Sequence, residues 1–244
     1  MRRRFFVDKF DASATAVIEG DAAHHLGHVL RAQTGQLYEL SDGASAWLAR
    51  IDSVSRKRVE FALIEQLPAP QTTVDVTLLL SIVKFDAFEW AIEKATELGV
   101  ARIVPLAAAR SEKGLLAAAT KRSHRWQKIL LESSQQSRRL RVPDLGELAK
   151  PTQAFAAQTA DFRLMLSERS DAPSIRNSLA LANRAKSPAT AALAIGPEGG
   201  WTDDELAGAR AASFQEASLG QLILRTETAV ITALANLNFV LSLG

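Results

Sequence analysis

Short apolar runs alternate with stretches of helical periodicity from residue 74 towards the C-terminus. The run from Val74 to Val83 is mostly apolar, and apolar residues then recur at helical spacing between Phe88 and Leu98. Further apolar runs lie at 102–106, 163–166, 191–195 and 217–219. This alternation predicts an α/β fold in which helices cover a parallel sheet and ligands bind at the carboxyl ends of the strands.

The first 70 residues have a different pattern. One helix-like stretch, 22–30, interrupts short strand-like segments at 4–7, 15–18, 35–40, 45–51 and 58–64. The dipeptide Asp42-Gly43 predicts a hairpin, and Leu67-Pro68-Ala69-Pro70 has the composition of a linker. We therefore expect a small β-barrel or sandwich over residues 1–70 and a separate α/β domain over residues 71–244.

Composition excludes some classes of protein. The 244 residues contain no cysteine, which excludes disulfides and thiolate chemistry and fits a cytoplasmic protein. No apolar segment follows the basic start MRRRFFVDKF as in a signal peptide, and the apolar stretch Ala229–Leu243 is shorter than the ~20 residues of a membrane span. His24, His25 and His28 lack further ligands nearby, so we predict no metal.

The stretch AALAIGPEGGWTDDEL (191–206) is the first candidate binding loop. A buried strand is expected to end at Gly196-Pro197-Glu198-Gly199-Gly200, and Thr202 with Glu205 fits a capping box at the start of a helix. A tight turn needs fewer glycines, so this loop indicates close approach of its backbone to a ligand. Neither a Walker loop nor a GxGxxG fingerprint is present.

Two more loops follow predicted strands in the same way. Residues 218–225 precede a helix expected over 228–243, which is apolar on nearly every side and should be central. Arg225 and Glu227 at its entrance are either an active-site pair or a surface arginine with a carboxylate that compensates the helix dipole. Ser167-Glu168 ends the strand at 163–166, and we expect the three loops to form one pocket.

The sequence IGPEGGWTDDE (195–205), followed by LGQLILRTETAVITAL (219–234), resembles the RsmE family of 16S ribosomal RNA uridine N3-methyltransferases, which belong to the SPOUT class. The resemblance extends over nearly the whole chain. It includes Lys84, EWAIEKATELGVARIVPL (89–106), RWQKI (125–129), QSRRLRVP (136–143), LSE (166–168), His25-Leu26, Val29-Leu30-Arg31 and Asp42-Gly43. The family often has a glycine where Arg138 stands and an acid where Gln135 stands.

This resemblance implies an α/β fold with a SPOUT-type parallel sheet and a C-terminal trefoil knot, plus an N-terminal PUA-like β-barrel that helps to hold RNA. It also implies a homodimer that uses S-adenosyl-L-methionine to methylate N3 of a uridine in 16S ribosomal RNA, as free RNA or in the small ribosomal subunit. The implied cofactor-binding residues are Leu166, Ser167, Glu168, Ile195, Gly196, Pro197, Gly199, Gly200, Ser218, Leu219, Gly220, Leu222, Leu224 and Arg225.

The chemistry suggests roles for three charged residues. N3 of uridine is a poor nucleophile until its proton leaves, and Arg225 is the candidate for stabilising the anion that develops. Glu198 or Glu227 is the candidate base, unless the proton leaves to water, and Glu198 is expected mainly to cap N–H groups of its own loop. Candidate phosphate contacts are Arg2, Arg3, Arg4, Lys9, Arg31, Lys84, Arg110, Arg125, Arg138 and Arg139.

Two alternatives compete with the methyltransferase hypothesis. The first is a non-catalytic RNA-binding or ribosome-assembly protein on the same fold, which eroded glycine loops would favour. The loops are intact here. The second is an α/β enzyme that binds a small nucleotide, and the missing GxGxxG and Walker patterns argue against it.

Overall fold

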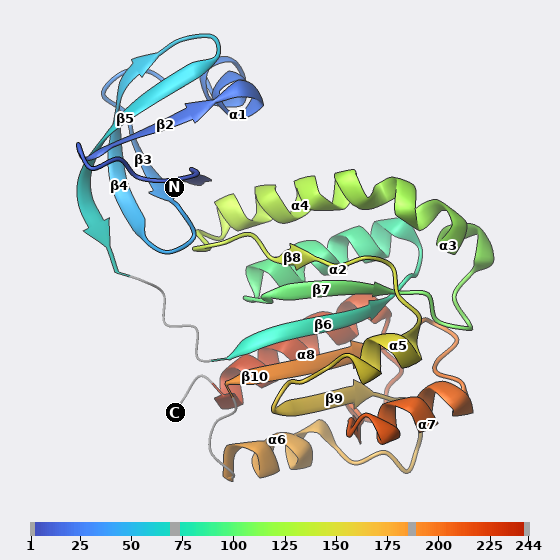
Figure 1. Ribbon diagram of the computed structural model, residues 1–244. Helices are drawn as coiled ribbons and strands as arrows, with labels where there is room; N and C mark the ends of the chain where they lie inside the picture. The colour runs from blue at the N-terminus through green and yellow to red at the C-terminus, as the bar shows by residue number, and fades with distance from the viewer. Residues whose placement is uncertain (1–2, 69–73, 185–188, 242–244) are drawn as a thin grey trace. The chain divides into compact units, whose positions relative to one another are not determined.

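The chain forms two compact units in the computed structural model, which describes residues 3–68, 74–184 and 189–241 (Figure 1). The first unit contains Met1–Gln71 together with Ser134–Val142, and the second contains Thr72–Ser133 and Pro143–Gly244. The segment 134–142 lies within the domain predicted over 71–244, but it packs with the first unit.

The first unit is built on a curled five-stranded sheet with the order β1-β3-β4-β5-β2 (Figure 1). Its strands are β1 (Arg4–Phe6), β2 (Thr15–Glu19), β3 (Leu37–Ser41), β4 (Ala46–Val54) and β5 (Arg58–Leu67). Register shifts in β4 opposite β5 interrupt the ladder, as β-bulges do where a sheet bends. The predicted hairpin is confirmed, since Asp42 accepts hydrogen bonds from the backbone N–H groups of Ala44 and Ser45.

The helical stretch expected at 22–30 is two consecutive short elements. The helix α1 (Gly20–His24) continues directly into the π-helix η1 (His25–Val29). The rings of His24 and His28 stack with their centroids 5.1 Å apart. No group of three or more His, Cys, Asp or Glu side chains suited to a metal ion occurs in the part of the chain that the structure describes.

Segment 134–142 is held on the first unit by a buried arginine. Arg4 is 5% exposed, forms an ion pair with Glu39 at 2.9 Å and donates a hydrogen bond to the carbonyl of Arg138 at 2.7 Å. Ser41 Oγ donates to the carbonyl of Leu140 at 2.7 Å. Arg138 itself has a φ of 56°. A glycine adopts this left-handed backbone more readily than any residue with a Cβ atom.

The second unit contains a six-stranded sheet with the order β11-β9-β10-β6-β7-β8, and all of its described pairs are parallel, as the alternating pattern predicted. The strands are β6 (Asp75–Ser81), β7 (Arg102–Leu106), β8 (Asp144–Leu145), β9 (Phe162–Leu166), β10 (Thr190–Ile195) and β11 (Gln215–Ala217). The strand expected at 217–219 was placed wrongly, because β11 ends at Ala217 and Ser218 already belongs to the following loop.

Helices cover both faces of this sheet (Figure 1). The helices α2 (Phe85–Glu97) and α8 (Thr226–Leu241) pack together on one face, and α5 (Pro151–Ala156) and α7 (Asp203–Ala211) lie on the other. The remaining helices are α3 (Lys113–Ala119), η2 (Thr120–Arg122), α4 (Ser123–Gln136) and α6 (Ile175–Arg184). On the α5 and α7 face, Trp201 and Phe155 join the buried apolar core of the sheet.

The last helix, which was expected to be central, packs against α2, α6 and β10 but is not covered on every side. Helix α8 buries one stripe, which includes Val230, Leu234 and Leu237, and leaves Phe239 70% exposed. Its predicted extension to residue 243 ends outside the described residues. No helix in the described ranges is long and apolar enough to cross a membrane.

Candidate functional site

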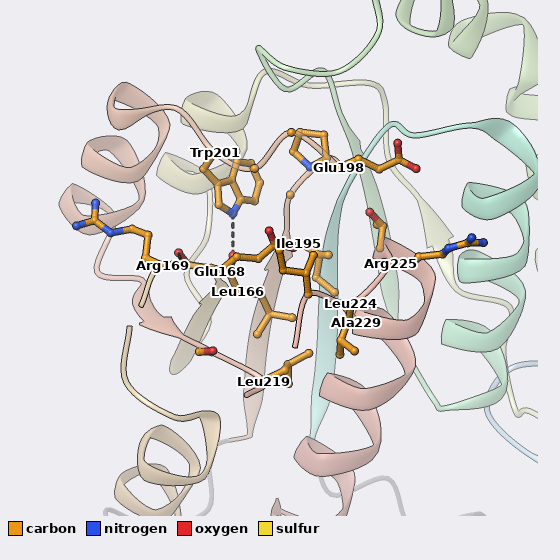
Figure 2. Close-up of a pocket in the computed structure, with 18 of the residues that line it drawn as sticks. Leu166, Glu168, Arg169, Ile195, Glu198, Trp201, Leu219, Leu224, Arg225 and Ala229 are labelled. Atoms are coloured by element: carbon orange, nitrogen blue, oxygen red, sulfur yellow. Dashed lines mark hydrogen bonds between the residues drawn. The ribbon is translucent and has the colours of Figure 1, made fainter. Parts of the chain in front are cut away.

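A pocket of about 630 Å³ lies at the carboxyl ends of β9, β10 and β11 (Figure 2). Three loops line it, 166–169, 195–201 and 218–225, together with Arg110 and with residues of α7 and α8. The structure brings every residue expected to bind the cofactor to this pocket: Leu166, Ser167, Glu168, Ile195, Gly196, Pro197, Gly199, Gly200, Ser218, Leu219, Gly220, Leu222, Leu224 and Arg225. The expectation that the three loops form one pocket is therefore confirmed.

Trp201 fixes the relative positions of two of these loops. Its indole Nε1 donates a hydrogen bond of 2.8 Å to the carbonyl of Leu166, as the dashed line in Figure 2 marks. The ring is 7% exposed and meets Phe155 edge to face. A Cβ atom at Gly196 would lie 3.0 Å from this indole. The absence of a side chain at Gly196 therefore makes room for the indole of Trp201, and Gly196 itself also lines the pocket.

Two other glycines of the pocket have backbones that only glycine adopts easily. Gly200 has a φ of 70°, and its N–H donates to the carbonyl of Pro197 at 2.8 Å, which closes a tight turn. Gly220 has a φ of 132°, and no described heavy atom lies within 4 Å of the position that its Cβ would take. The pocket is thus open at Gly220, where the backbone is bare.

The predicted capping box at the start of α7 is confirmed. Thr202 Oγ1 accepts from the N–H of Glu205, and Glu205 Oε2 accepts from the N–H of Thr202 at 2.8 Å. The other carboxylate oxygen, Oε1, accepts from the N–H of Ala109 at 2.8 Å. The buried carboxylate of Glu205 therefore joins the glycine loop to the loop that follows β7.

Glu198 and Arg225 both have free charges at the pocket. Glu198 is exposed and accepts no hydrogen bond within the described residues, so the expectation that it caps the N–H groups of its loop is wrong. Arg225 is exposed and has no hydrogen-bond or ion-pair partner among the same residues. Figure 2 shows both side chains extending towards the same side. Glu227 lies in the first turn of α8 and does not line the pocket.

Sequence reasoning missed some lining residues. Arg110, Arg169, Leu206, Thr226 and Ala229 also line the pocket, as do Trp201, Gln221 and Ile223 within the predicted loops. Arg169 forms an ion pair with Asp171 at 3.0 Å, and the hydrogen bond between them raises the pKa of the guanidinium. Arg169 directly follows the predicted loop residue Glu168, so extending that loop by one position would have found it.

The candidate RNA contacts differ in their surroundings. Arg3, Lys9, Arg31, Lys84 and Arg110 are exposed, whereas Arg4 is buried. Arg125 is bound to the buried carboxylate of Glu89 at 2.8 Å, and Arg138 lies 3.4 Å from the carboxylate of Glu39. Arg139 donates to the carbonyl of Arg141. Arg2 lies outside the described residues. The cations therefore differ in how much of their charge is available to a phosphate.

Comparisons with known proteins place this fold and site in a class. The RNA methyltransferase domain family matches residues 70–238, and the RNA methyltransferase PUA domain family matches residues 18–64. The fold and the site thus define a member of the RNA methyltransferases.

Individual relatives are more specific. The ribosomal RNA small subunit methyltransferase E of Synechocystis sp. is 34% identical over 236 residues, which cover 93% of this chain and 74% of that protein. The enzyme of the same name from Rickettsia conorii is 32% identical over 87% of this chain and 84% of its own. The chain belongs to the ribosomal RNA small subunit methyltransferase E family.

Solved structures agree with this membership. The crystal structure of a ribosomal RNA small subunit methyltransferase E from Neisseria gonorrhoeae, bound to S-adenosyl methionine, superposes with a TM-score of 0.85 at 28% identity. The match covers 98% of each chain. A putative methyltransferase from Legionella pneumophila, also in complex with S-adenosyl methionine, gives the same TM-score, identity and coverage.

Proposed function

We propose that this protein transfers a methyl group from S-adenosyl-L-methionine to N3 of a uridine in 16S ribosomal RNA. The observation that carries the proposal is the convergence of three loops on one pocket at the carboxyl ends of β9, β10 and β11. Relatives of this fold are crystallised with S-adenosyl methionine. The choice of N3 and of uridine rests on the resemblance of the paired motifs at 195–205 and 219–234 to the RsmE family.

The pocket fits this cofactor in size and in chemistry. Its volume of about 630 Å³ lies within the ~300–1,000 Å³ of small-molecule sites. Ile195, Leu219 and Leu224 supply apolar surface for a purine base, and the open backbone at Gly220 admits a ligand. When bound, the cofactor supplies an electrophilic methyl group on a sulfonium.

The residues of the chain have to bind, orient and deprotonate the acceptor base. A uridine in a duplex presents N3 to its partner, so the base must be unpaired and turned towards the pocket. We assign to the free guanidinium of Arg225 the stabilisation of negative charge on the uracil oxygens as the N3 proton leaves. Glu198 extends to the same side and is the candidate acceptor of that proton, with Glu227 and water as the alternatives.

RNA is held, in this proposal, by both units. The PUA-like domain predicted over residues 1–70 contributes the exposed cations Arg3 and Arg31, and the methyltransferase domain predicted over 71–244 contributes Lys84. Each is exposed and forms no ion pair within the described residues. Such phosphate contacts position the RNA without reading its sequence. Because the substrate belongs to the small ribosomal subunit, we place this activity in the cytoplasm.

The proposal includes two features implied by the RsmE resemblance. One is a trefoil knot formed by the C-terminal segment of the second unit. The other is a homodimer. Leu222 and Ile223 in the loop before α8, and Phe239 near the end of α8, are 82%, 80% and 70% exposed, and an interface with a second copy would cover such apolar side chains.

Calorimetric titration with S-adenosylhomocysteine tests the cofactor site. Ala229→Trp fills the pocket from an ordinary helical backbone in α8, and Ala207→Trp places the same side chain on the exposed face of α7 as the control. We expect saturable binding by the wild type and by Ala207→Trp, and binding at least about tenfold weaker by Ala229→Trp.

Circular dichroism shows whether each variant keeps its fold. Equal affinity of Ala229→Trp and the wild type would place the cofactor somewhere else. Absence of wild-type binding, with and without RNA, would reject the methyltransferase proposal and favour a non-catalytic RNA-binding protein.

A further inference from the structure

The loop after β7 reaches the pocket although its strand is not adjacent to the pocket strands. The strand order β10-β6-β7 places β6 between them. Arg110 from this loop donates a hydrogen bond from Nη1 to the carbonyl of Gly199 at 2.9 Å. Its stem lies against the same glycine, since a Cβ at Gly199 would be 3.2 Å from Arg110 Cβ. Arg110 thus contacts the glycine loop by both packing and hydrogen bonding.

A neighbouring hydrogen bond holds the other end of the same loop. The N–H of Ala109 donates to Glu205 Oε1, while Glu205 Oε2 accepts from the N–H of Thr202. Adjacent residues of the β7 loop therefore hold the glycine loop at Gly199 and, through Glu205, at Thr202. Between these points lies the bare backbone at Gly200, whose freedom makes ordering this segment costly in entropy.

The β7 loop itself is firmly anchored. Ser111 Oγ donates to the carbonyl of Ile82, directly after β6, at 2.7 Å. The N–H of Ala107 donates to the carbonyl of Ala149 at 2.8 Å. A loop fixed at both ends can hold the glycine loop in one conformation, and the glycine loop forms a wall of the pocket.

We infer that Arg110 is a positioning residue that holds the glycine loop in its cofactor-binding conformation, and not a phosphate contact as its charge suggests. This inference rests on the proposed function, because the conformation that Arg110 holds matters only if the pocket binds S-adenosyl-L-methionine. Arg110 acts through the carbonyl of Gly199 and so affects affinity for the cofactor more than the chemical step.

The test compares Arg110→Met, which keeps the stem but removes every donor and the charge, with Arg110→Lys, which keeps a charge and a donor. Arg102→Met is the matched control, since Arg102 is an exposed arginine at the opposite end of β7 whose side chain has no hydrogen-bond or ion-pair partner among the described residues. For each variant we would measure the Kd for S-adenosylhomocysteine, the KM for S-adenosylmethionine, kcat, and the salt dependence of RNA binding.

Loss of one charge-assisted hydrogen bond that holds a binding loop is expected to weaken ligand affinity by about tenfold. We expect Arg110→Met to raise the Kd and the KM for the cofactor by about tenfold, with kcat at saturating cofactor within about twofold of wild type. The salt slope of RNA binding should not change. Arg110→Lys should recover part of the affinity, and Arg102→Met should match the wild type.

Two results would overturn the inference. An unchanged Kd and KM, with a salt slope reduced by about one, would identify Arg110 as a phosphate contact. No change in any quantity would show that the loop keeps its conformation without Arg110. A wild-type protein that binds no S-adenosylhomocysteine would overturn the proposed function as well. The first two results leave cofactor binding by the wild type intact, so failure of the inference on Arg110 can be told apart from failure of the proposed function.

Discussion

Replacing Gly196 by alanine places a methyl group against the indole of Trp201. The new Cβ would lie 3.0 Å from Cε2 and 3.1 Å from Nε1 of that ring, where carbon atoms normally approach to about 3.5–4.0 Å. The indole has little freedom to retreat, because it is buried, bonded to the carbonyl of Leu166 and packed on Phe155. Overpacking of this kind costs about 1–3 kcal/mol.

Thermal unfolding and cofactor titration measure the two consequences. For a chain of this size about 1 kcal/mol corresponds to ~2–4 °C, so we expect Gly196→Ala to lower the Tm by about 2–12 °C. The affinity for S-adenosylhomocysteine should also fall, because Gly196, Trp201 and Leu166 all line the pocket.

Gly114→Ala in α3 is the matched control. Its Cβ would meet nothing closer than 3.7 Å, so it should keep the affinity and raise the stability by up to about 1 kcal/mol. If Gly196→Ala kept both the wild-type Tm and the wild-type affinity, the assigned role of the indole would be refuted.

Two further predictions concern backbone strain and pH. Arg138→Gly and Arg138→Ala both lose the ion pair with Glu39, but glycine adopts the φ of 56° more easily than alanine does. In urea unfolding, Arg138→Gly should therefore be more stable than Arg138→Ala by about 1 kcal/mol. Equal stabilities of the two variants would contradict this reasoning. The Asp161 carboxylate accepts hydrogen bonds from the Thr190 hydroxyl, from the Thr190 N–H and from the Ala189 N–H, which lower its pKa below the ordinary 3.8. The stability that the Asp161 carboxylate contributes is present above the ordinary pKa and is lost as the pH falls through the lowered pKa. Asp161→Asn should therefore be less stable than the wild type at neutral pH, and it should lose less stability than the wild type below about pH 5 in an acid titration. Parallel stability curves for the two proteins would contradict this.

Features set by local sequence were predicted well. Apolar runs alternating with helical periodicity led to the parallel sheet, because each run reports the burial of its own strand. The loops after 166, 195 and 217 could be assigned to one pocket because the carboxyl ends of parallel strands share an edge of the sheet. The capping box at Thr202 was also predicted correctly, because its two partners, Thr202 and Glu205, are only three residues apart.

Features that depend on long-range packing were not predicted. Arg4 and Arg138 were expected to be phosphate contacts, and the sequence did not show that both pair with Glu39, which lies far from Arg138 along the chain. The sequence predicted that Glu205 caps α7, but it could not show that the second oxygen of this carboxylate binds the N–H of Ala109 in the β7 loop. The apolar composition of α8 indicated burial but could not show which of its faces the sheet leaves uncovered.

The proposed activity of this pocket is methylation of N3 of a uridine in 16S ribosomal RNA. The most direct measurement incubates the purified protein and labelled S-adenosylmethionine with small ribosomal subunits from cells that lack this enzyme, followed by mass spectrometry of the nucleosides. We predict incorporation of about one methyl group per subunit, recovered as N3-methyluridine. This incorporation should be lost in Ala229→Trp and kept in Ala207→Trp. A different methylated nucleoside would contradict the assigned acceptor atom, and no incorporation by a protein that binds S-adenosylhomocysteine would contradict the assigned substrate.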